Sequence, residues 1–138
     1  MRYWFTIWAH QNRKAMNRKI LITESDVDIR LLLSSLLRKH YQVFFLNDAE
    51  QLLEGSFEKP DLFILNNQMP GVSIQEVCRH LKTNIHTRKI PILIIAGSED
   101  IDALREKCPG DDIITKPFSG AELLAKVHSA IDINITSR

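Results

Sequence analysis

The feature that most constrains the fold of this chain is an alternation of short apolar runs with amphipathic segments, repeated five times from residue 19 onward. Apolar runs of about 4–8 residues are typical of buried strands, and apolar residues at i, i+3, i+4 and i+7 are typical of helices. Parallel strands need crossover helices between them, and these crossovers are right-handed. The alternation therefore predicts an α/β domain, in which one doubly wound, five-stranded parallel sheet carries helices on both faces.

The five expected strands are short apolar runs: residues 20–22, 43–46, 62–65, 90–95 and 113–114. Asn47, Ser73 and Ser119 are each followed three residues later by a glutamate, a capping-box pattern that predicts three helix starts. The helix expected over residues 26–40 has one apolar face, formed by Ile29, Leu32, Leu33, Leu36 and Leu37. A weaker helix is expected over residues 98–107, and the last helix carries Leu123, Leu124, Val127 and Ile131.

Composition narrows the class of protein. With 138 residues the chain suits one domain, and its formal net charge of +1 argues against a strongly basic nucleic-acid binder. No apolar run approaches the roughly 20 residues of a membrane-spanning helix. Cys78 and Cys108 lack a CxxC spacing, so neither a disulfide scaffold nor a zinc site is expected, and they are interpreted as lone thiols that fill the core or are half-buried. The five histidines show no metal-ligand spacing. The cytoplasm is the expected compartment.

Residues 1–18 differ from the rest, because they contain four Lys or Arg side chains and no acid. They also hold four of the ten aromatic residues: Tyr3, Trp4, Phe5 and Trp8. The apolar stretch is too short, and lacks the small-residue motif, for a secretory signal. We expect an N-terminal extension over 1–18, one domain over 19–132 and a tail over 133–138. An alternative use of this extension is contact with single-stranded nucleic acid or an anionic membrane.

The candidate site consists of the residues that follow the expected strands, at the edge where doubly wound sheets bind their ligands. These residues form four groups: Thr23-Glu24-Ser25, Asn66-Asn67-Gln68, Ala96-Gly97 and Thr115-Lys116-Pro117. Together with their strands, in segments 19–30, 60–71, 90–95 and 111–118, they resemble the receiver domain of bacterial two-component response regulators. The resemblance covers residues 19–131 and implies the flavodoxin-like strand order 2-1-3-4-5.

The resemblance also implies a phosphorylation site, and most of its positions are substituted here. The family's phospho-acceptor is an aspartate after the third strand, where this chain has Asn66, and a neutral carboxamide is a poor nucleophile. The family has two acidic residues after the first strand, and this chain has Glu24 and Ser25 at those positions, so one carboxylate of the pair remains. With Gln68 as a further carbonyl, we expect weak or absent Mg²⁺ binding and no other cofactor.

The two switch positions of the family are substituted as well. Ala96 stands where the family has a Ser or Thr, and Ile113 where it has an aromatic ring. Lys116 and Pro117 match the family, and the bond between them is expected to be cis. We expect the Lys116 ammonium to pair with Glu24 and to hydrogen-bond Asn66. Asp111 and Asp112 are expected to be solvated loop acids at the opposite end of the fifth strand.

These substitutions favour a degenerate, stand-alone receiver that acts as a protein-binding module in phosphorelay signalling and is not an enzyme. Output by a partner or by self-association is expected because the chain ends seven residues after Ile131. The resemblance places the partner, a histidine kinase or an output protein, on the fourth helix, fifth strand and fifth helix, around Asp102, Arg105, Glu106, Ile113 and Lys126. A homodimer is an open possibility, and nucleic-acid or membrane partners are not expected. The alternative within the family is phosphorylation at a non-standard residue.

Overall fold

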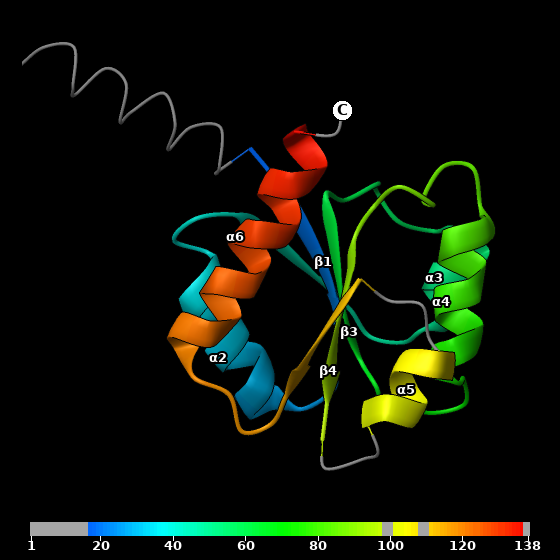
Figure 1. Ribbon diagram of the computed structural model, residues 1–138, viewed down its shortest axis with the longest axis horizontal. Helices are drawn as coiled ribbons and strands as arrows, with labels where there is room; N and C mark the ends of the chain where they lie inside the picture. The colour runs from blue at the N-terminus through cyan, green and yellow to red at the C-terminus, as the bar shows by residue number, and fades with distance from the viewer. Residues whose placement is uncertain (1–16, 98–100, 108–110, 137–138) are drawn as a thin grey trace, which may run out of the picture.

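The computed structural model describes residues 17–97, 101–107 and 111–136, and the first sixteen residues of the expected extension lie outside these ranges. Its five strands form one parallel sheet in the order β2-β1-β3-β4-β5 (Figure 1). The strands are β1 (Lys19–Thr23), β2 (Gln42–Leu46), β3 (Leu62–Asn66), β4 (Ile92–Ala96) and β5 (Asp112–Thr115). The helices are α2 (Val27–Leu37), α3 (Glu50–Glu54), α4 (Ile74–Thr83), α5 (Ile101–Lys107) and α6 (Gly120–Thr136). The predicted fold class and strand order are confirmed.

Helices cover both faces of the sheet, with α2 and α6 on one side and α3, α4 and α5 on the other (Figure 1). Side chains alternate along β1, so Ile20 and Ile22 pack under α2 and α6 while Leu21 points to the opposite layer. The central strand β4 is buried along its whole length, as expected for a parallel strand covered on both faces. Among the helices of the described ranges, none is long and apolar enough to cross a membrane.

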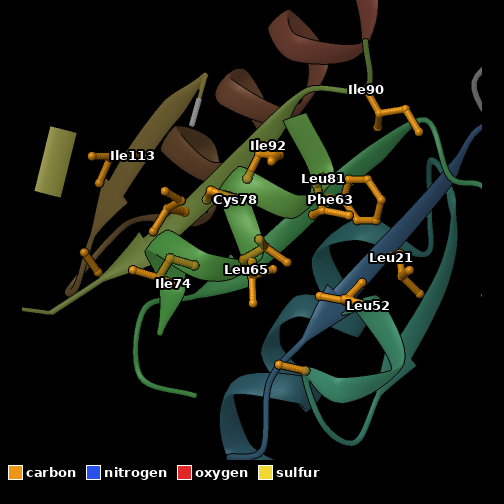
Figure 2. Close-up of a cluster of buried hydrophobic side chains, with 14 of the residues drawn as sticks. Leu21, Leu52, Phe63, Leu65, Ile74, Cys78, Leu81, Ile90, Ile92 and Ile113 are labelled. Atoms are coloured by element: carbon orange, nitrogen blue, oxygen red, sulfur yellow. The ribbon is translucent and has the colours of Figure 1, made fainter. Parts of the chain in front are cut away.

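The layer around α4 forms the larger apolar cluster (Figure 2). Helix residues Ile74, Cys78 and Leu81 lie there over Phe63 and the neighbouring strand residues. Cys78 is fully buried, as expected for a core residue, but it is also disulfide-bonded, so the interpretation as a simple core-filling thiol is wrong. Cys108 lies outside the described residues.

Two of the three predicted helix caps are confirmed. Ser73 Oγ accepts a hydrogen bond from the Glu76 amide at 3.1 Å, and Ser119 Oγ accepts one from the Glu122 amide at 3.0 Å. The cap expected at Asn47 is wrong, because Asp48 Oδ1 accepts from the Gln51 amide at 3.2 Å and α3 begins at Glu50. The side chain of Asp48, one residue after Asn47, thus takes the role of accepting from a free backbone amide at the start of the helix.

Helix α2 buries fewer apolar residues than its sequence suggests. Leu33 and Leu37 are fully buried, whereas Leu32 is 42% exposed and does not belong to the core face. One residue corresponds to about 100° of rotation in an α-helix, so Leu32 is turned away once Leu33 faces the sheet. At the other end of the chain, α6 continues to Thr136, into the segment expected as the tail.

Candidate functional site

The carboxyl ends of β1, β3, β4 and β5 bring the predicted site residues to one edge of the sheet. Thr23 is in register with Leu65, Asn66 with Ile95, and Ala96 with Thr115. The chain order reverses between β1 and β3, which makes their ends the topological switch point. Glu24 and Asn66 extend from these two strands, so they lie at the point where such sheets build binding sites.

Glu24 and Asn66 are joined by a direct hydrogen bond. The Asn66 amide group donates through Nδ2 to Glu24 Oε2, and Asn66 Oδ1 accepts from the backbone amide of Gln68 at 2.9 Å. Glu24 is only 4% exposed, and a buried carboxylate is costly unless a donor satisfies it. The carboxamide therefore ties the end of β1 to the loop after β3 through both of its polar atoms.

Lys116 follows β5 at the same edge of the sheet but does not pair with Glu24 as expected. Its backbone amide donates to the Ala96 carbonyl at 2.8 Å, and the Lys116–Pro117 bond is cis, as predicted. Although both side chains lie in the described part of the chain, no ion pair within 4.0 Å joins Lys116 to Glu24, so the expected pairing is wrong. Glu24 already accepts a hydrogen bond from the Asn66 amide group. Because Asn66 is neutral, it also does not attract the Lys116 ammonium as an aspartate at this position would.

The other two members of the expected acidic pocket take no direct part in the Glu24–Asn66 contact. Ser25 is exposed, and Gln68 contributes through its backbone amide. The hydroxyl of Thr23, which is 3% exposed, instead donates to Met69 Sδ at 3.3 Å. Sequence reasoning missed this second link between β1 and the loop, because a threonine at the end of a strand and a methionine in a turn carry no pairing signal.

The two switch positions of the resemblance are ordinary core residues. Ala96 is fully buried and Ile113 is 8% exposed, and both belong to the apolar cluster of the α4 layer. Ile113 pairs in register with Ile94 in the middle of the β4–β5 ladder. Neither side chain has a hydroxyl or ring that could hydrogen-bond a group at the strand ends.

Asp111 and Asp112 lie at the opposite end of β5 from Lys116, as predicted, but they are not simply solvated. Asp111 Oδ2 accepts from Lys82 Nζ and from the Ile92 amide, both at 2.7 Å. Asp112 Oδ2 accepts from Lys126 Nζ at 3.0 Å. These half-exposed acids fasten the start of β5 to β4 and to helices α4 and α6, because a carboxylate accepts several charge-assisted bonds.

Sequence reasoning also missed a cluster of Tyr41, His40 and His128, which lies outside the site at the carboxyl ends of the strands. Tyr41 Oη and His128 Nδ1 are hydrogen-bonded, and the His40 and His128 rings meet edge to face with centroids 5.4 Å apart. Burial, then the neighbouring His40, lowers the pKa of His128, while Asp132 opposes that shift. Burial and Asp132 raise the pKa of Tyr41.

The residues at the strand ends fit a divalent cation poorly. Glu24 is the single carboxylate among Glu24, Ser25 and Asn66, and one of its oxygens is engaged by Asn66. Within the described ranges no three His, Cys, Asp or Glu side chains are grouped as a metal site would require. Mg²⁺ prefers several hard, anionic oxygen ligands in octahedral geometry, and this donor set does not supply them.

Comparison with known proteins gives a consistent result. A family model of the response regulator receiver domain matches residues 20–128. The transcriptional regulatory protein YrkP of Bacillus subtilis is 39% identical over 115 residues, which cover 81% of this chain and 48% of that protein. The alkaline phosphatase synthesis transcriptional regulatory protein PhoP of the same organism is 36% identical over 120 residues, covering 84% and 49%. The chain thus spans about half the length of these relatives.

A solved structure agrees in fold and in family. The signal receiver domain of a signal transduction histidine kinase from Syntrophus aciditrophicus matches with a TM-score of 0.76 and 28% identity, covering 84% of this chain and 91% of that one. The family match spans most of the chain, the sheet order is the one this family implies, and the polar residues gather at its switch point. The chain belongs to the response regulator receiver domain family of two-component signalling proteins.

Proposed function

We propose that this receiver domain works without phosphorylation, as a binding module in phosphorelay signal transduction rather than as an enzyme. The observation that carries the proposal is the Asn66 carboxamide, which is bonded to Glu24 through nitrogen and to the Gln68 amide through oxygen. Phosphoryl transfer to a side chain needs an anionic or activated nucleophile, and this oxygen is neutral and already an acceptor.

The donor set at the strand ends supports weak or absent Mg²⁺ binding as part of the same proposal. One buried carboxylate, already hydrogen-bonded, replaces the several anionic oxygens that an Mg²⁺ site prefers. Substituting Asn66 by aspartate would add one carboxylate, while Ser25 would still leave the site short of another.

For the partner surface we propose the face formed by α5, β5 and α6. A shallow cavity of about 340 Å³ lies there, lined by Arg105, Asp111, Asp112 and Ile113. Asp102 and Glu106 are exposed on α5, and the Lys126 ion pair with Asp112 fixes one border. The mixture of both charge signs with an apolar strand residue suits a protein partner, for which we propose a histidine kinase or an output protein.

The experiment that tests this function is incubation of the full chain with a small phosphodonor such as acetyl phosphate and Mg²⁺, followed by intact-mass measurement. We expect no phosphoryl adduct, under conditions that label a receiver with an acceptor aspartate. Asn66→Asp serves as the matched variant, and we expect at most partial labelling of it. A stoichiometric adduct on the unaltered chain would contradict the proposal, and peptide mapping would then locate the non-standard acceptor.

A further inference from the structure

The outer face of α2 carries two large apolar side chains that the fold leaves uncovered. Val27 is 67% exposed and Leu31 is 64% exposed, and they stand one helical turn apart on the side away from the buried Leu33 and Leu37. Figure 1 shows α2 next to α6 in one layer, and α2 packs on the sheet through Leu33 and Leu37, so its Val27–Leu31 face is not the one buried in the core. Scattered exposed apolar residues are common, but two on adjacent turns form a stripe.

A shallow cavity of about 300 Å³ runs beside this stripe, between α2 and β2. It is lined by Val27, Arg30, Leu31, Ser34, Arg38 and Phe45. The Arg30 guanidinium lies 4.7 Å from the centre of the Phe45 ring, which fixes this arginine over the floor of the cavity. The small Ser34 side chain follows Leu31 along the helix, so a second helix can approach closely at that point.

Charges at the two ends of α2 have opposite signs. Asp26 caps the helix and Asp28 lies exposed in its first turn, whereas Arg38 closes the helix and Lys39 follows it, both exposed. Two copies of such a helix laid side by side in opposite directions bring each acidic end against a basic end. A parallel arrangement would instead place like charges together, which disfavours it.

We propose that this α2 face binds a second copy of the chain, with the two α2 helices packed antiparallel about a two-fold axis. With the axis between Leu31 and Ser34, each Leu31 faces Ser34 of the other copy. Val27 then lies on the aliphatic stem of the other copy's Arg38, and Asp26 and Asp28 lie beside its Arg38 and Lys39. A two-fold contact requires a self-complementary surface, and this charge pattern provides one.

The dimer is expected to be weak and concentration-dependent. An eleven-residue helix is about 16 Å long, so the contact is smaller than the roughly 800 Å² per partner of a standard interface. The contact leaves the α5, β5 and α6 face free. It also does not depend on whether Asn66 can be phosphorylated, so the failure of one proposal leaves the other standing.

The first test is sedimentation velocity of the full chain over a concentration series reaching about 1 mM, a range that detects weak association. We expect a reversible rise toward dimer, and Leu31→Glu should weaken it at least about tenfold. The matched control is Ile85→Glu, because Ile85 is 73% exposed in the segment after α4, far from α2, and its substitution should leave the association unchanged. A chain that stays monomeric throughout the series would overturn the proposal.

The second test exchanges the charges. Asp28→Arg alone and Arg38→Glu alone should each weaken the dimer, because each brings like charges together, and the double variant should recover most of the association. Equal loss in the single variants without recovery would exclude the antiparallel arrangement. A third variant, Trp4→Ala/Trp8→Ala, tests the N-terminal segment. If this variant loses the association while Leu31→Glu retains it, the N-terminal segment mediates self-association and the proposal is overturned.

Discussion

Replacing a carboxylate by a carboxamide at position 66 changes the local electrostatics from repulsion to attraction. Two carboxylates at the ends of β1 and β3 would repel one another and require a cation between them, whereas Asn66 donates directly to Glu24. Lys116 is consequently not needed as a counter-ion, in line with the lack of an ion pair between it and Glu24 in the described structure. The sequence predicts the members of this site, but which donor reaches Glu24 depends on side-chain geometry that no pattern encodes.

Asn66→Asp should destabilise the domain. The substitution removes the donor to the buried Glu24 and adds a like charge beside it, at a cost of about 2 kcal/mol. We expect a fall of about 8 °C in Tm at neutral pH, measured by thermal denaturation. Asn67→Asp is the control, because the Asn67 backbone amide donates to Ile95 and that bond survives the change. An unchanged Tm in Asn66→Asp would show that the Glu24–Asn66 bond contributes nothing to stability.

The cluster around His128 predicts a pH dependence of stability. The folded state lowers the pKa of His128, so it binds fewer protons than the unfolded chain. The free energy of unfolding should therefore decrease as the pH falls below the ordinary histidine value of about 6.5, and level off below the lowered folded pKa. Urea titrations between about pH 5 and 8 measure this. His128→Gln should flatten the curve, whereas substitution of the exposed His86 should not.

At the scale of elements, short-range polar contacts decide where helices and strands begin. Ser73 and Ser119 are predicted correctly because a serine three residues before a glutamate has few competitors for the free amide. The same pattern fails at Asn47, where Asp48 competes and wins. The Thr23–Met69 link and the paired state of Asp111 could not be predicted, since both join segments far apart in the sequence.

Asp111→Ala tests how β5 is held in place. The change removes the acceptor of the Ile92 amide and of Lys82, and we expect a loss of about 1–2 kcal/mol from the free energy of unfolding. Most of it should come from the backbone donor, because an ion pair at a half-exposed acid contributes little. Lys82→Met should therefore cost less than Asp111→Ala in urea unfolding. Glu106→Ala on exposed α5 is the control, and an equal cost there would contradict this anchoring role.

For the whole molecule, the alternation of apolar runs and amphipathic segments was sufficient to predict the sheet, its two helical layers and, with the family resemblance, its strand order. Local periodicity determines these features, because each element buries one face whatever its exact ends are. The apolar surface of α2 was not predicted, since Leu31 and Leu32 look alike in sequence until the orientation of the helix is known.

The filled switch positions predict a domain with one conformation. Ala96 and Ile113 are packed in the core and offer no group to reorient, so a phosphoryl mimic has no second state to stabilise. Amide NMR spectra of the full chain should be nearly identical with and without beryllofluoride and Mg²⁺. Large, saturable shifts running from Asn66 to Ile113 would contradict this and indicate a surviving switch.

The backbone hydrogen bond of Asn67 has a consequence for the chemical ageing of the protein. Spontaneous deamidation of an asparagine begins with attack of the next residue's backbone nitrogen on the side-chain carbonyl carbon, which expels ammonia and forms a cyclic succinimide. Water then opens this ring, and at Asn66 the product would be aspartate or isoaspartate. The Asn67 nitrogen is held in the sheet by its bond to the Ile95 carbonyl at 2.9 Å, and the Asn66 carboxamide is held at both ends. Asn66 should therefore deamidate far more slowly in the folded protein than in the unfolded chain. The fold thus protects the carboxamide at position 66 from conversion to a carboxylate.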